Sequence, residues 1–233
     1  MNAAADWGST IMTASTWVLP VIIAVTFHEA AHGFVAYRFG DDTAWQAGRI
    51  TLNPFKHVDP FGTLLLPAML ILLRSPFLFG YAKPVPVDFS RLRHPRRDMV
   101  WVALAGPGMN VLLAIVSSLL FYTVDYVPPQ PAEWVAANLV HSIQLNAVLC
   151  VFNMIPLPPL DGGRVAVGVL PRFLALPLAR LERYGMMILL LFLFILPMLG
   201  SQIGHDLNLV GWLISTPARA LIEFVLWITG QSE

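Results

Sequence analysis

The stretch TFHEAAHGFV, residues 26–35, decides the fold, and it lies inside an apolar run that covers residues 17–39. An apolar run of about 20 residues is long enough to cross a bilayer as a helix. This run nevertheless carries two histidines and a glutamate, and ionisable side chains inside a membrane helix are costly and usually functional. The stretch therefore predicts a membrane helix that also carries part of a functional site.

The composition supports a bilayer as the solvent. Of the 233 residues, 57% are apolar and only 12% are charged, and the formal net charge is zero. This profile is typical of a membrane protein and not of a soluble domain. No basic stripe with interleaved aromatic residues is present, so we expect the lipid bilayer and no nucleic acid as a partner. The only cysteine, Cys150, excludes an intramolecular disulfide.

Six apolar segments are candidate membrane spans: 17–39, 61–81, 99–124, 134–155, 185–203 and 207–230. Two of them carry features that argue against a simple crossing. The segment 61–81 contains two prolines and Arg74, and 207–230 contains Arg219 and Glu223. Because charges at depth are costly unless they are paired or face a cavity, either segment could be re-entrant or interfacial. We therefore expect about five to six membrane helices.

The charge of the connections predicts the orientation. Arginines and lysines are concentrated in residues 82–98 and 156–184, whereas 125–133 and 204–206 contain none. By the positive-inside rule, the basic connections face the cytoplasm. The spans 99–124 and 134–155 then run outward and back inward. We also expect the N-terminus to lie outside. The first apolar run is expected to stay as a helix instead of being removed as a signal peptide.

A small β-hairpin or sheet is expected after the first span. Residues 44–52, AWQAGRITL, combine aromatic and β-branched residues with Gly48, which could form a turn. Such a pattern is typical of a short pair of strands at the membrane surface.

The H-E-x-x-H order of residues 28–32 indicates metal chemistry. In a helix, His28 and His32 lie one turn apart on the same face, so that their imidazoles can bind one ion. Glu29 beside them is the residue that acts as general base in zinc hydrolases with this motif. The alternative, a set of satisfied polar residues in a helix core, does not explain three ionisable groups in five positions of an apolar run.

A catalytic zinc needs a third protein ligand. The candidates are His57, His94, His141, Asp88, Asp125 and Asp161. Asp161 lies in NMIPLPPLDGG, directly after the span 134–155, where the prolines predict an extended backbone. Such backbone at membrane depth must be buried in protein or line a wet cavity. Asp161 is therefore the favoured ligand, although a plain proline-glycine loop would also explain the prolines.

If one ion joins the two halves, the membrane topology is constrained. The two histidines and Asp161 must lie near the same, cytoplasmic, face, so an even number of crossings separates them. The spans 99–124 and 134–155 supply two. The segment 61–81 is therefore predicted to be re-entrant or shallow.

These motifs together resemble the site-2 protease family of intramembrane zinc metalloproteases, in the bacterial branch without a PDZ domain. The resemblance rests on FHEAAHGFVAYRFGD, GRITLNPFKHVDPFGTLLLP, AKPVPVD, LAGPGMN and FNMIPLPPLDGGRV, in this order. It implies that His28, His32 and Asp161 bind one Zn²⁺ and that Glu29 is catalytic. It also implies that Asn153 stabilises the oxyanion or positions substrate, although an asparagine bonded to backbone where the helix ends is an equal alternative. The segment 61–81 is additional to the three-span core of the family.

We therefore expect an all-α polytopic membrane protein whose helices surround an intramembrane zinc site. Residues 1–233 would form a single metalloprotease domain, with a catalytic core at about 17–165 and C-terminal helices at about 185–230. The expected activity is hydrolysis of transmembrane substrates in the cell (inner) membrane, near its cytoplasmic side. The alternatives are a membrane zinc-binding or transport protein and a non-cutting scaffold for transmembrane partners. The sequence leaves open the substrate, the oligomeric state, and the roles of His57 and of residues 83–86.

Overall fold

The computed structural model describes residues 3–72, 80–202, 204 and 208–231. Within these ranges the regular structure is helical and contains no strand. The longer helices are α1 (Ala3–Arg38), α4 (Pro95–Phe121), α5 (Pro129–Asn153) and α10 (Leu209–Ile228). The shorter ones are α2 (Thr43–Gln46), α3 (Leu66–Leu72), α6 (Asp161–Val169), α7 (Arg172–Arg180), α8 (Glu182–Leu190) and α9 (Leu196–Gln202). Turns of 3₁₀- or π-helix cover Pro54–Lys56, Pro60–Leu65, Phe89–Arg91, Val124–Tyr126 and Leu191–Ile195.

Five helices in the described part of the chain are long and apolar enough to cross a membrane. They are Ile11–Arg38, Pro95–Phe121, Pro129–Asn153, Glu182–Gly200 and Gly211–Ile228. The protein is therefore an all-α membrane protein, and the expected number of about five to six membrane helices is confirmed at five. The segment 207–230, which carries Arg219 and Glu223, contains one of these five helices, although residues 205–207 lie outside the described residues.

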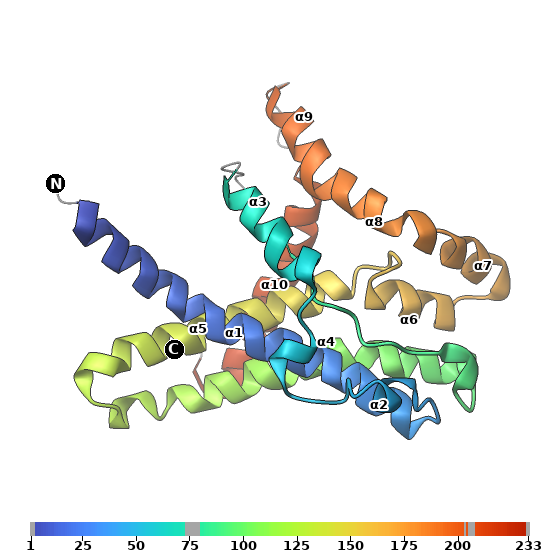
Figure 1. The fold of residues 1–233 in the computed structure, drawn as a ribbon, viewed down its shortest axis with the longest axis horizontal. Helices are drawn as coiled ribbons and strands as arrows, with labels where there is room; N and C mark the ends of the chain where they lie inside the picture. Colours follow the sequence, from blue (N-terminus) through green and yellow to red (C-terminus); the bar gives the residue numbers. More distant parts are fainter. Residues whose placement is uncertain (1–2, 73–79, 203, 205–207, 232–233) are drawn as a thin grey trace.

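The centre of the molecule is a bundle of α1, α4 and α5 (Figure 1). The helix α4 runs antiparallel to both of the others. Its first half contacts the second half of α1 through Val102 and His32. Along α4, Asn110 contacts Asn146 of α5 and Ser117 contacts Ser142, so the residue numbers of the two helices run in opposite directions. Polar groups inside this bundle hydrogen-bond to one another, because lipid offers them no hydrogen-bond partner.

The loop between α5 and α6 is packed tightly against the start of α6. A Cβ atom on Gly162 would lie 2.2 Å from the carbonyl oxygen of Met154, and one on Gly163 would lie 2.2 Å from the nitrogen of Pro158. Both positions therefore require glycine, because backbone atoms cannot move aside for a methyl group. This close packing fixes Asp161, the first residue of α6, against the bundle.

The expected β-hairpin at residues 44–52 is wrong. The structure has the short helix α2 there, followed by a turn in which the N–H of Arg49 donates to the carbonyl of Ala44. Asp41 fixes the start of α2 by accepting from the N–H and the hydroxyl of Thr43. Gly48 does adopt a positive φ of 63°, but it closes a helical turn instead of joining two strands. A local capping interaction thus overrides the strand preference of the aromatic and β-branched residues.

The segment 61–81 does not form a spanning helix in its described part. Turns of π-helix over Pro60–Leu65 continue into α3, and together they have a length of about 20 Å, which is too short for a hydrocarbon core of about 30 Å. Residues 73–79 lie outside the described residues. The N–H of Tyr81 donates to the carbonyl of Gly62, so the two ends of the segment lie side by side.

Candidate metal centre

The helix α1 presents His28 and His32 to the interior of the bundle. Both side chains are buried, with exposed fractions of 7% and 9%, and their Nε2 atoms lie 3.0 Å apart. One helical turn between the residues gives this proximity, as the i, i+4 spacing predicts.

Asp161 brings its carboxylate to the same point from α6. Its Oδ2 atom lies 3.3 Å from the Nε2 atoms of both His28 and His32, and the side chain is also buried. Two ligand atoms bound to one tetrahedral zinc at 2.0–2.1 Å lie about 3.3 Å apart. Within the described residues, these three side chains are the only group of His, Cys, Asp or Glu arranged to hold a metal ion.

Hydrogen bonds to α4 fix which nitrogen of each imidazole faces the centre. The Nδ1 of His28 lies 2.6 Å from the Oδ1 of Asn110, and the Nδ1 of His32 lies 2.7 Å from the carbonyl oxygen of Val102. Because a carbonyl oxygen only accepts, each Nδ1 carries the proton and each neutral ring directs the lone pair of Nε2 to the centre. Partners of this kind orient histidine ligands in metal sites.

The donor set therefore fits a zinc ion. Two imidazole lone pairs and a carboxylate oxygen converge on one point, and Oδ2 of Asp161 is buried without a hydrogen-bond donor among the described residues. A metal at this point requires the Asp161 carboxylate in its ionised form and both imidazoles neutral, and the Nδ1 hydrogen bonds of the two rings favour that neutral form.

Gly106 of α4 keeps this point open. A Cβ atom at position 106 would lie 2.3 Å from the Nε2 of His32 and 2.5 Å from the Nε2 of His28. Any side chain there would fill the space in front of the ligand atoms. The motif LAGPGMN therefore supplies both the open space, through Gly106, and the partner of His28, through Asn110.

A chain of hydrogen bonds supports Asn110 from behind. Its Nδ2 donates to Oδ1 of Asn146, whose own Nδ2 donates to the carbonyl of Ser142. Both asparagines are fully buried. Sequence reasoning gave no role to Gly106, Asn110 or Asn146. The available signal was the two amide side chains inside apolar spans, because polar groups within a membrane are costly and usually functional.

Glu29 and Asn153 lie at different places in the structure. Glu29 follows His28 on α1 and is half-buried, and its Oε2 accepts a hydrogen bond from the backbone N–H of Val85 at 2.8 Å. Asn153 is the last residue of α5, and its Nδ2 donates to the carbonyl of Leu149 at 3.0 Å. Asn153 is not one of the three converging donors.

The other candidate ligands lie in structural contacts. The ring of His141 stacks on Trp17 at 3.9 Å, and the Nε2 of His57 donates to the carbonyl of Thr51. Asp88 caps the turn at Phe89–Arg91, and hydrogen bonds from Ser90 lower the pKa of its carboxyl. His94 precedes α4, and Asp125 lies in the turn between α4 and α5.

Curated relatives of this chain are named zinc metalloproteases. The chain is 40% identical over 190 residues to the Bacillus subtilis protein named "Putative zinc metalloprotease YwhC", which covers 80% of this chain and 82% of that protein. It is 31% identical over 207 residues to "Putative zinc metalloprotease Rip2" of Mycobacterium tuberculosis strain H37Rv, which covers 88% of this chain and 74% of that protein. It is 29% identical over 142 residues to "Putative zinc metalloprotease MJ0611" of Methanocaldococcus jannaschii, which covers 60% of this chain and 62% of that protein. No protein-family model and no solved structure matches the chain.

The fold and the site define a membrane-embedded zinc metalloprotease. The chain belongs to the zinc metalloprotease family of these relatives, in agreement with the resemblance of its motifs to the site-2 proteases. Its cofactor is zinc, and His28, His32 and Asp161 form a group that could hold a metal ion.

Proposed function

We propose that this protein hydrolyses peptide bonds of transmembrane substrates within or next to the membrane. The observation that carries the proposal is the convergence of two imidazoles and one carboxylate, all buried, in a protein whose described part has five helices long and apolar enough to span a bilayer. A soluble substrate would have to leave water to reach such a site, whereas a transmembrane segment is already at that depth.

The residues have distinct roles in this proposal. His28, His32 and Asp161 hold the zinc ion, which when bound polarises the scissile carbonyl and lowers the pKa of a water molecule. Glu29, one residue from a ligand, takes the proton of the attacking water and later gives it to the leaving amine. Asn153 would position the substrate or stabilise the oxyanion from the end of α5.

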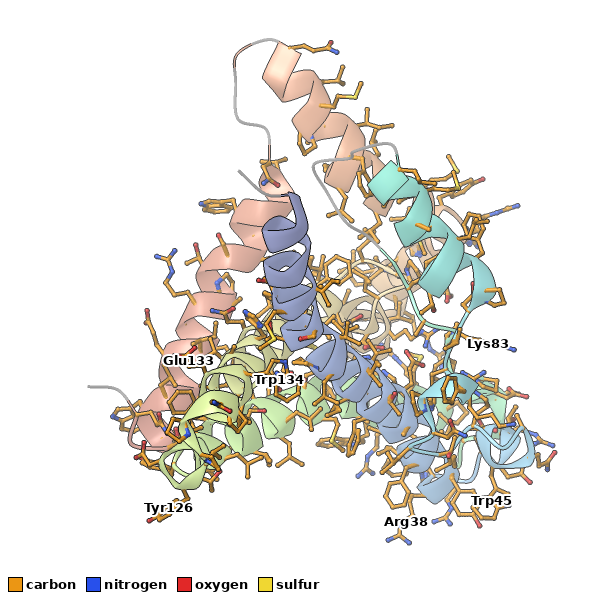
Figure 2. The ribbon with its side chains drawn as sticks, turned by 60° about the vertical axis from the view of Figure 1, so that its left-hand side comes forward. Arg38, Trp45, Lys83, Tyr126, Glu133 and Trp134 are labelled. Atoms are coloured by element: carbon orange, nitrogen blue, oxygen red, sulfur yellow. The ribbon has the colours of Figure 1, made fainter. Side chains whose placement is uncertain are left out.

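The proposed location is the cell (inner) membrane, with the site near its cytoplasmic side. The two ends of the central bundle differ in charge, and Figure 2 shows Arg38, Trp45 and Lys83 near one end and Tyr126 at the opposite end. The positive-inside rule places the basic end in the cytoplasm. His28 and His32 lie in the half of α1 that ends at Arg38. We propose that the segment 61–81 enters and leaves on this same side, as the pairing of Gly62 with Tyr81 favours.

Quantitative proteomics of membrane fractions tests the proposal. Cells that express the wild type are compared with cells that express Glu29→Gln, which keeps the shape of the side chain and all three ligands. We expect at least one transmembrane protein to accumulate in the variant and to be cut in the wild type. The cut site, mapped by its new terminus, should lie inside or beside a transmembrane segment.

Cellular zinc, measured beside the proteome and also in a His28→Ala variant, separates the alternatives. If the protein transported or stored zinc, cellular zinc would depend on His28 but not on the carboxylate of Glu29. If it were a scaffold that does not cut, Glu29→Gln would leave the membrane proteome unchanged. Either result would contradict the proposed protease.

A further inference from the structure

Residues Lys83–Pro86, which we call the strap, pass α1 beside Glu29 without regular secondary structure. The prolines at positions 84 and 86 restrict the backbone on both sides of Val85. They also leave Val85 as the only residue between Lys83 and Val87 that has a backbone N–H. The side chain of Val85 is buried, and it packs where Gly33 of α1 leaves room: a Cβ there would lie 3.0 Å from Val85.

Two buried side chains and one backbone carbonyl hold the two ends of the strap. At the first end, the N–H of Lys83 donates to the carbonyl of His57, and the guanidinium of Arg49 donates to the carbonyl of Lys83 at 2.7 Å. Beyond the other end, the N–H of Asp88 donates to the carboxylate of Asp41 at 2.7 Å. The side chains of Arg49 and Asp41 are buried, with exposed fractions of 6% and 0% for these residues. These two side chains and the backbone carbonyl of His57 thus fix a segment that has no regular secondary structure of its own.

The centre of the strap donates to the proposed base. The N–H of Val85 lies 2.8 Å from the Oε2 of Glu29. A carboxylate on a helix can otherwise rotate among several rotamers, and a charge-assisted hydrogen bond from a fixed amide restricts it to one. With Oε2 held, the positions open to Oε1 are restricted as well.

We propose that Val85 is a positioning residue for Glu29, and that Arg49, His57 and Asp41 act through the strap to keep its N–H in place. This inference rests on the proposed function, and it assigns a role to the Lys83–Pro86 and His57 features of the sequence. The proton transfer requires the carboxylate within hydrogen-bond reach of the attacking water. The strap, which is not part of α1, holds the carboxylate of Glu29 in that position.

Hydrogen exchange tests the contact without any substrate. Deuterium uptake at single amides of residues 80–88 is measured by mass spectrometry with electron-transfer fragmentation, for Glu29→Ala and for Glu29→Gln as the matched control. Glu29→Ala should speed exchange at Val85 by about tenfold or more, because a hydrogen bond to a charged group is worth at least that factor. Exchange at Lys83 and Asp88 should stay within about twofold. Glu29→Gln retains an oxygen acceptor and should keep Val85 protected.

Kinetics test the positioning role. Val85→Pro removes the N–H that donates to Glu29, at a position where the following Pro86 already favours an extended backbone. Val87→Pro is the control, because it removes an N–H for which no acceptor is found among the described residues. With the substrate from the proteomic comparison, Val85→Pro should lower kcat by about 100-fold with KM and bound zinc unchanged, since small misplacements of catalytic groups cost this much. Val87→Pro should keep its activity. Arg49→Gln, which weakens the anchor of Lys83, should show a smaller loss of the same kind.

Two results would overturn the inference. The first is an exchange rate at Val85 that is equal in Glu29→Ala and in the wild type. A joint rise in exchange at Lys83, Val85 and Asp88 would count in the same way, because it would mean only that the strap loosens. The second is equal kcat for Val85→Pro and Val87→Pro at equal zinc content. If the wild type cuts nothing, the proposed function fails, and the exchange experiment still decides whether Val85 holds Glu29.

Discussion

A methyl group at position 106 should displace the metal from this protein. In Gly106→Ala, the new Cβ would lie 2.3 Å from the Nε2 of His32 and 2.5 Å from that of His28. The closer imidazole must retreat by about 0.7 Å to reach 3.0 Å, a distance below which real Cβ contacts are essentially not found. Metal–ligand distances tolerate about 0.2 Å. We therefore expect zinc affinity to fall by at least about 100-fold, or about 3 kcal/mol.

The assay is zinc competition with a chromophoric chelator on detergent-purified protein, together with zinc content by mass spectrometry. Gly108→Ala is the matched control, because a Cβ at position 108 of the same helix meets no atom within 4 Å. The control should hold zinc as the wild type does. Equal zinc affinity in Gly106→Ala and Gly108→Ala would refute the reasoning, since it would place the metal away from the ring nitrogens that face Gly106.

Three further predictions follow from contacts around the site. Asn110→Ala removes the acceptor of His28 Nδ1, and it should weaken zinc binding by about 10- to 100-fold in the same competition assay. Gly163→Ala would place a Cβ 2.2 Å from the nitrogen of Pro158, so its melting temperature and zinc content should both fall, whereas Gly8→Ala, in open space, should match the wild type. In Ser90→Ala, the pKa of Asp88 should rise because the hydroxyl that stabilises its carboxylate is lost. A carboxylate with a lowered pKa stabilises the fold above its ordinary pKa of about 3.9, and this stability is lost as the pH falls through the folded pKa. The difference in melting temperature between wild type and Ser90→Ala should therefore shrink between pH 7 and pH 3.

The spans and half of the site were predictable from local patterns. Hydropathy identified the central helices because lipid demands long apolar helices whatever their partners are. The i, i+4 spacing of His28 and His32 predicted their convergence for the same local reason. Asp161 required more than a local pattern: the unusual backbone that the prolines predict favoured this residue as the third ligand, and the resemblance to the family then supported the same choice.

What the sequence left out depends on contacts between distant elements. No local pattern tells which helix faces His28, so neither Asn110 nor Gly106 could be assigned to the metal site from its own neighbourhood. The bond from Val85 to Glu29 joins the strap to α1 and has no periodic signal. The predicted hairpin at residues 44–52 is wrong for the opposite reason. There a local contact, the hydrogen bonds from Thr43 to Asp41, outweighs a pattern of strand-forming residues.

The central claim is that α1 and α6 together hold one zinc ion through His28, His32 and Asp161. Zinc X-ray absorption spectroscopy on the purified protein tests this most directly. The account predicts one zinc per chain with two imidazole ligands, oxygen ligands and no sulfur, and it predicts loss of this spectrum in Asp161→Ala. A sulfur ligand, or an unchanged spectrum in Asp161→Ala, would contradict it.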